Sequence, residues 1–178
     1  AEELRKIAEE ILVLPEPRVL STIQKARQAK ALAFASDARL HEKANRLKEA
    51  LTAWNQARQL DISHSDYDEN WRRVRLVFSQ RALSANPGEN ETQGILQELQ
   101  NELSDEPQVL ILVAEQYYRL SRLSRLSAEQ RLEYLELAGR EIKSALSRTE
   151  LSPAERGQLN DLQQKIENDN TILRQQAD

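Results

Sequence analysis

Prolines divide this sequence into segments whose apolar residues recur every three or four positions. Pro15 and Pro17 close the first segment, Pro87 closes a long second stretch, Pro107 follows the third, and Pro153 opens the last. A proline inside a helix removes a hydrogen bond and breaks the helix, whereas a proline at a boundary is tolerated. The prolines are therefore read as boundaries between helices.

The apolar spacing within the segments is that of one helix face. Three such stripes are Tyr67-Trp71-Val74-Phe78-Ala82, Ile95-Leu96-Leu99-Leu103 and Leu159-Leu162-Ile166-Leu173. Ser127 to Gln130 and Ser152 to Glu155 carry the serine and the acid or amide that start a helix as a capping box. We find no alternating strand pattern. The spacing predicts an all-α chain with helices near 2–14, 18–60 (broken once), 66–85, 91–104, 108–124, 128–149 and 153–173.

Two of these segments share a pattern of small and large residues. Ala50, Trp54 and Ala57 alternate small, large and small at intervals of four and three, and the stretch closes with Leu60-Asp61. Ala138, Ile142 and Ala145 repeat the pattern in the segment after Ser127. Small residues seven apart let another helix cross closely, while the large residue fills the groove between them.

This pattern resembles the second helix of the tetratricopeptide repeat, and residues 110–117 resemble its first helix. The resemblance implies antiparallel helical hairpins stacked as a tetratricopeptide-like α-solenoid of about seven or eight helices. We expect a single domain over 1–178 with an N-terminal extension helix over 1–15. The departures are Ile62 where the family has proline, an inserted stretch at 119–127, and no strict 34-residue period. An irregular antiparallel helical bundle is the alternative, and the two heptads at 40–54 are too few for a coiled-coil rod.

The composition argues against several classes of function. There are 25 Lys and Arg against 29 Asp and Glu, so the net charge of −4 argues against nucleic acid as the partner. The chain has no Cys and only two His, and its four Gly are isolated, so the sequence predicts no enzyme, no cofactor and no metal site. No apolar run approaches the roughly 18 residues that span a bilayer, so direct membrane insertion is not expected.

The resemblance also implies where a partner protein or peptide binds, because arrays of hairpins expose one face built by their first helices. The predicted partner-binding residues on this face are Arg39, Glu42, Lys43, Gln108, Ile111, Glu115 and Tyr118. Tyr118 is the strongest single candidate, because Tyr117 beside it can pack between helices while Tyr118 presents a large contact surface.

Three functions follow from these observations. The first is a non-catalytic interaction or scaffold module that binds a partner protein or peptide. The second is a structural spacer or dimerisation domain of a larger envelope or signalling protein, which makes a homo-oligomer an option. The third, a small-molecule sensor or enzyme, has the least support. The first residue, Ala1, is not an initiator, so we expect a processed chain or a cytoplasmic or periplasmic domain of a larger protein.

Overall fold

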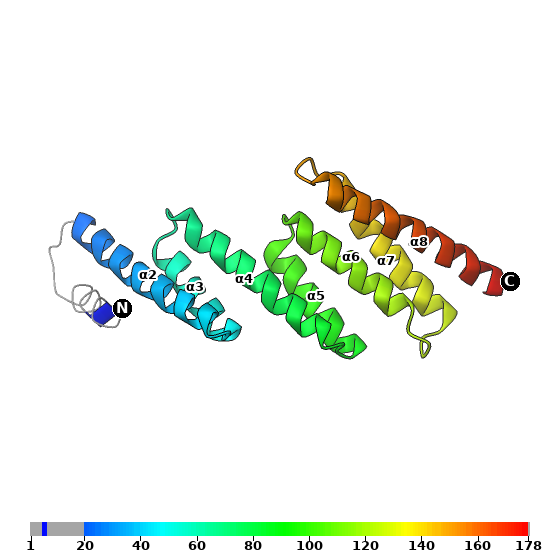
Figure 1. Cartoon of the computed structure of the whole chain (residues 1–178), viewed down its shortest axis with the longest axis horizontal. Helices are drawn as coiled ribbons and strands as arrows, with labels where there is room; N and C mark the ends of the chain where they lie inside the picture. Colours follow the sequence, from blue (N-terminus) through cyan, green and yellow to red (C-terminus); the bar gives the residue numbers. More distant parts are fainter. Residues whose placement is uncertain (1–4, 7–19, 178) are drawn as a thin grey trace. The chain divides into compact units, whose positions relative to one another are not determined.

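The computed structural model describes residues 5–6 and 20–177, and within them every regular element is an α-helix (Figure 1). The helices of this part are α2 (Leu20–Lys43), α3 (Leu47–Leu60), α4 (Ser65–Ser84), α5 (Glu89–Leu103), α6 (Pro107–Ser121), α7 (Ala128–Leu146) and α8 (Pro153–Ala177). The all-α prediction is thus confirmed for these residues. The helix expected over 2–14 falls outside them, apart from residues 5 and 6.

The chain forms two compact units, unit 1 ending at Arg81 and unit 2 beginning at Ala82. Unit 1 contains α2, α3 and most of α4, and unit 2 contains α5 to α8. The backbone of α4 continues across the boundary.

The predicted break in the 18–60 segment lies between α2 and α3, at Asn45. Its φ angle of 60° is left-handed, which Asn tolerates better than most residues. The amide of Asn45 donates to the carbonyl of Glu42 (2.8 Å), and that of Arg46 donates to the carbonyl of His41 (2.9 Å). This pair of bonds is a Schellman motif, which satisfies the last carbonyls of α2 and turns the chain into α3.

The core of unit 1 is built where α2 and α3 run side by side (Figure 1). Small and large residues share this contact, and all of them are fully buried: Ala31, Ala35 and Ala38 from α2, and Ala50, Trp54 and Ala57 from α3. From α4, Tyr67, Trp71 and Val74 are buried as their stripe predicts. The Trp54 and Tyr67 ring centroids are 6.2 Å apart.

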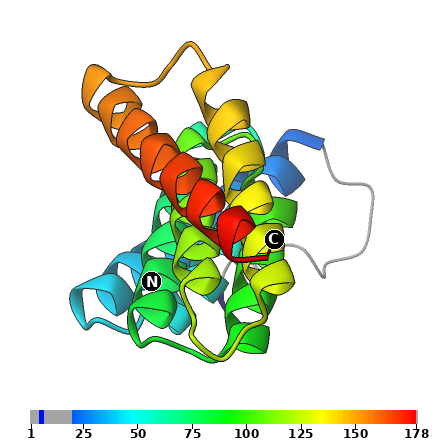
Figure 2. The same cartoon turned by 90° about the vertical axis from the view of Figure 1, so that its right-hand side faces the viewer.

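Unit 2 is centred on the α6 and α7 pair, against which α8 packs (Figure 2). The core includes Ala138, Ile142 and Ala145 of α7 and the predicted α8 stripe from Leu159 to Leu173. Ser127 caps α7 as predicted, since its hydroxyl accepts from the amide of Gln130 (3.2 Å) and its own amide donates to the Gln130 side chain (3.0 Å).

The helix predicted over 108–124 is shorter in the structure and ends at Ser121. Beyond this residue the backbone tightens, because Arg122 and Leu123 donate their amides to the carbonyls of Arg119 (3.2 Å) and Leu120 (3.1 Å). Hydrogen bonds between residues three positions apart form a 3₁₀ turn, which is common at the end of an α-helix. Residues 122–127 therefore form the connection to α7, in the stretch that the sequence marked as inserted.

Candidate functional site

Glu42 joins three helices of unit 1. The indole Nε1 of Trp54 in α3 donates to Glu42 Oε1 (2.7 Å), and Arg73 in α4 donates to Glu42 Oε2 (2.6 Å). The carboxylate is half-buried at the end of α2, and the two donors use both of its oxygens. In this structure the first role of Glu42 is therefore to hold α2, α3 and α4 together.

Arg39 and Lys43 are the predicted residues of unit 1 that face solvent. The guanidinium of Arg39 lies over the Trp54 ring, 5.5 Å from its centroid, so its position is set by a cation–π contact. Lys43 lies in the last turn of α2, where a cation is favoured by the helix dipole. Both side chains remain accessible to a partner.

Tyr118 and Glu115 connect α6 to α8 in unit 2. The hydroxyl of Tyr118 donates to Asp169 Oδ2 (3.0 Å), and Glu115 Oε1 accepts from Gln158 (2.6 Å). Burial and the bonded Asp169 carboxylate raise the pKa of the Tyr118 hydroxyl. The Arg122 guanidinium lies 5.8 Å from the Tyr118 ring centroid.

Tyr117, the neighbour of Tyr118, takes the packing role that the sequence assigned to one of the two tyrosines. Its ring stacks on Tyr134 of α7 with a centroid separation of 6.2 Å. Burial raises the pKa of the Tyr117 hydroxyl.

The remaining two predicted residues differ in exposure. Gln108 is exposed in the first turn of α6. Ile111 is only 7% exposed and belongs to the core of unit 2 together with Leu135 and Leu159. The prediction that Ile111 faces a partner is therefore corrected: the apolar side chain faces the neighbouring helices, because burial there removes it from water.

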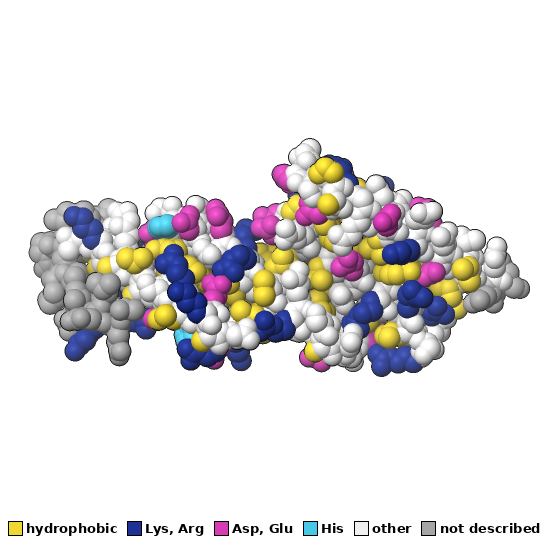
Figure 3. Space-filling view, in the orientation of Figure 1, with side chains coloured by type: hydrophobic (Ala, Val, Ile, Leu, Met, Phe, Trp, Pro, Cys, Tyr) yellow, Lys and Arg dark blue, Asp and Glu magenta, His cyan; other side chains and the backbone are white. Residues whose placement is uncertain are grey.

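A hollow of about 200 Å³ adjoins Tyr118 in unit 2, and sequence reasoning missed it. Its lining residues come from the residue after α6, the start of α7 and the end of α8: Arg122, Arg131, Asp169, Ile172 and Leu173. Arg131 is fixed by a hydrogen bond from Nε to the carbonyl of Ser121 (2.8 Å), whereas Ile172 is 51% exposed. Figure 3 shows hydrophobic and basic side chains next to each other over α6 and α8.

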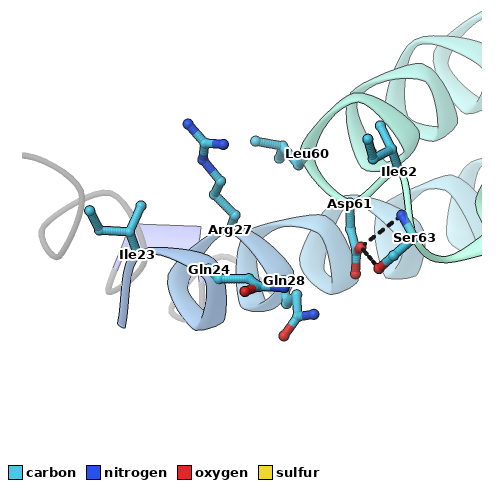
Figure 4. A pocket seen from close by; sticks show the side chains of 8 residues that line it. All are labelled: Ile23, Gln24, Arg27, Gln28, Leu60, Asp61, Ile62 and Ser63. Atoms are coloured by element: carbon cyan, nitrogen blue, oxygen red, sulfur yellow. Dashed lines mark hydrogen bonds between the residues drawn. The ribbon is translucent and has the colours of Figure 1, made fainter. Parts of the chain in front are cut away.

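A second hollow, of about 270 Å³, lies in unit 1 between the start of α2 and the link from α3 to α4 (Figure 4). Its lining residues are Ile23, Gln24, Arg27, Gln28, Leu60, Asp61, Ile62 and Ser63. Asp61 Oδ1 accepts from both the amide (3.2 Å) and the hydroxyl (2.5 Å) of Ser63, which fixes the turn. Ile62, where the repeat family has proline, is 91% exposed.

The link from α3 to α4 also carries a group of charges around Asp68. This carboxylate accepts from Arg58 (2.8 Å) and Arg72 (2.6 Å). Burial raises the pKa of Asp68, but the hydrogen bonds from the two guanidinium groups outweigh burial and hold the pKa below its ordinary value. Arg58 also stacks on Trp71, 3.6 Å from the ring centroid, so these charges serve the packing of α3 on α4.

Among the described residues, no group of three or more His, Asp or Glu side chains is placed to hold a metal ion. No helix in the same part of the chain has the length and apolar character needed to cross a membrane.

Comparison with known proteins gives no relative: no family model, curated protein or solved structure significantly matches the chain.

Proposed function

We propose that the chain is a non-catalytic interaction module of tetratricopeptide-like helical hairpins, which binds a partner protein or peptide on the face of its first helices. The proposal rests on one observation, the equivalence of Glu42 and Tyr118. Each follows by four residues a fully buried alanine, Ala38 in α2 and Ala114 in α6. Each forms a hydrogen bond with the second helix after its own: Glu42 accepts from Arg73 of α4, and Tyr118 donates to Asp169 of α8.

This equivalence supports a repeated architecture. The first helix of each pair is tied to the helix that follows the pair, so that α2 neighbours α4 in unit 1 and α6 neighbours α8 in unit 2. The second helices add to the argument, since Ala50-Trp54-Ala57 and Ala138-Ile142-Ala145 are buried in the same small-large-small order. Within each unit, first helices placed side by side form the kind of face that hairpin arrays use for binding.

Exposed groups on these helices favour binding over a purely structural role. Arg39 and Lys43 are exposed on α2. On the α6 and α8 side, the hollow beside Tyr118 offers two guanidinium groups and the exposed Ile172. Arginine and tyrosine are among the residue types that supply most interface energy.

Capture of a partner tests the proposal. The immobilised full chain is incubated with a lysate of its source organism, and the most enriched protein is purified and titrated against the chain and its variants. We expect Arg39→Glu and Tyr118→Ala each to weaken binding about tenfold or more. Lys165→Glu, an exposed cation on α8, is the matched control and should change binding less than twofold.

Circular dichroism of each variant shows whether the fold is kept. Capture of no protein, or binding that neither substitution weakens, would contradict the proposal. A tight dimer through residues 18–60, seen by light scattering at rising concentration, would favour the alternative role as a dimerisation domain.

A further inference from the structure

One exposed face of α2 carries cations and leucines but no acidic residue. We define the α2 stripe as Lys25, Gln28, Leu32, Arg39, Leu40 and Lys43, all of which are exposed. Lys25, Leu32 and Arg39 are spaced by seven residues, which keeps them on one side of a helix. This seven-residue spacing is the sequence signal that could have revealed the stripe.

The two leucines are unusual for a solvent-facing surface. Leu32 is 49% exposed and Leu40 is 59% exposed. They lie eight residues apart, which corresponds to about 12 Å along a helix axis. A second helix lying along α2 meets both leucines with side chains that are about two turns apart.

The other faces of α2 pack against or pair with residues of unit 1. Ala31, Ala35 and Ala38 are buried in the core of unit 1. Arg5 pairs with Asp37, and its guanidinium lies 4.0 Å from the centroid of the Phe34 ring. The two acidic residues of α2 are Asp37 and Glu42. Glu42 is hydrogen-bonded to Trp54 and Arg73. The acids of this helix are therefore off the stripe and already paired.

The charge of the chain is divided unevenly between its units. Unit 1 has 15 Lys and Arg against 12 Asp and Glu, a net charge of +3, whereas unit 2 has 10 against 17, a net charge of −7. The acidic balance of the whole sequence thus hides a basic half, to which the α2 stripe belongs. An acidic partner is the electrostatic complement of this half.

We propose that the α2 stripe docks an acidic amphipathic helix of a partner protein, with its apolar residues on Leu32 and Leu40 and its carboxylates facing Lys25, Arg39 and Lys43. The inference rests on the proposed function and names the class of partner. Lys43 lies 18 positions after Lys25, so the stripe is about 27 Å long and the docked helix needs about five turns. The leucines set this partner apart from nucleic acid, whose phosphates complement the cations alone.

Fluorescence polarisation with designed peptides tests the proposal on the full chain. The probe is a fluorescein-labelled helix of about 21 residues, with leucines on one face and glutamates beside them. The control probes are the same helix with lysines in place of glutamates, a scrambled peptide of the acidic composition, and a single-stranded oligonucleotide. We expect binding of the acidic amphipathic helix alone, weakened by salt.

Paired variants locate the binding. Lys25→Glu/Lys43→Glu should weaken binding about tenfold or more, because it reverses two of the three cations. Arg46→Glu/Lys48→Glu changes the net charge equally at exposed positions outside α2 and should alter binding less than twofold. Leu32→Ser/Leu40→Ser should also weaken binding about tenfold with all charges kept. Arg39 stays unchanged in these variants because it contacts Trp54.

Several results would overturn the inference. These are failure of the acidic helix to bind, equal binding of the scrambled or lysine peptide, equal loss in the two charge variants, and stripe-dependent binding of the oligonucleotide. A concentration-dependent doubling of mass that Lys25→Glu/Lys43→Glu abolishes would identify a second copy as the occupant instead. Partner capture that is unaffected by this variant would refute the stripe and leave the proposed function standing, whereas absence of any captured partner would refute the proposed function itself.

Discussion

Glu42 and Tyr118 were predicted to meet a partner, and both also hold helices of their own chain together. Each supplies a polar atom to a bond between helices that are far apart in sequence. Polar groups that are partly buried need such partners, because losing water without a new hydrogen bond is costly. Substitutions at these two residues should therefore change both stability and binding. Substitutions at the exposed residues of α2 should change binding with little effect on stability.

Replacing Glu42 should be costly for this reason. Glu42→Ala leaves the buried indole Nε1 of Trp54 without its acceptor, so the free energy of unfolding should fall by about 1–3 kcal/mol. Lys43→Ala, at the exposed neighbouring position, should change it by less than about 0.5 kcal/mol. Urea denaturation of the two variants measures both values. Equal stability of the two would show that the Trp54–Glu42 bond adds little.

Tyr134 gives the chain a distinct response to alkaline pH. Burial and the hydrogen bond to Glu89 raise the pKa of Tyr134 from 10.0 to about 12. Since the folded pKa is above the unfolded one, folding favours the neutral phenol; this contribution is complete below pH 10 and is lost as the pH rises through 12. The absorbance at the tyrosinate band, taken as the difference between wild type and Tyr134→Phe, should titrate near the higher value. A midpoint near the ordinary pKa would contradict the burial of Tyr134.

At the scale of elements, the capped starts and the apolar stripes of the helices were predictable from local chemistry. Ser127 and the α8 stripe took their expected places because each depends on residues within a few turns. The C-terminal limit of α6 was not predictable in this way. Residues 122–124 could have continued the helix, but the chain turns after Ser121 toward α7. Ile111 was expected on an exposed face because the repeat pattern does not say which positions of α6 are covered by neighbouring helices.

The capping box of α7 should have a measurable value. Ser127→Ala removes the hydroxyl that accepts from the Gln130 amide, and should lower the free energy of unfolding by about 1 kcal/mol. Ser124→Ala, in the exposed connection before α7, is the control and should be neutral within about 0.5 kcal/mol. Denaturant midpoints at constant slope give both numbers, and a neutral Ser127→Ala would mean that water caps α7 equally well.

For the whole molecule, the continuity of α4 matters most. Its backbone runs from unit 1 into unit 2, where Leu83 near its end is buried. Because α4 belongs to both units, unfolding of either unit removes part of a helix that the other unit uses. The seven-residue spacing of the α2 stripe is visible in the sequence. The exposure of Leu32 and Leu40 and the hollow beside Tyr118 could not be predicted from it, because they depend on contacts between distant segments.

We expect the two units to unfold together. Both tryptophans, Trp54 and Trp71, lie in unit 1, so fluorescence reports on that unit while far-ultraviolet circular dichroism reports on all helices. Leu135→Ala, in the core of unit 2, should cost about 2–5 kcal/mol and lower the urea midpoint by both methods. A fluorescence transition that stays in place while the dichroism splits into two steps would show that the units unfold independently.

The connection between α6 and α7 has a further consequence. Residues 119–127 are three successive copies of Arg-Leu-Ser. The first copy ends one helix, the second spans the turn, and the third supplies the serine that begins the next helix. Removing or duplicating one triplet would leave the same residues at the end of α6 and at the start of α7. A change of one triplet thus alters the length of the connection without altering the residues that end α6 and cap α7.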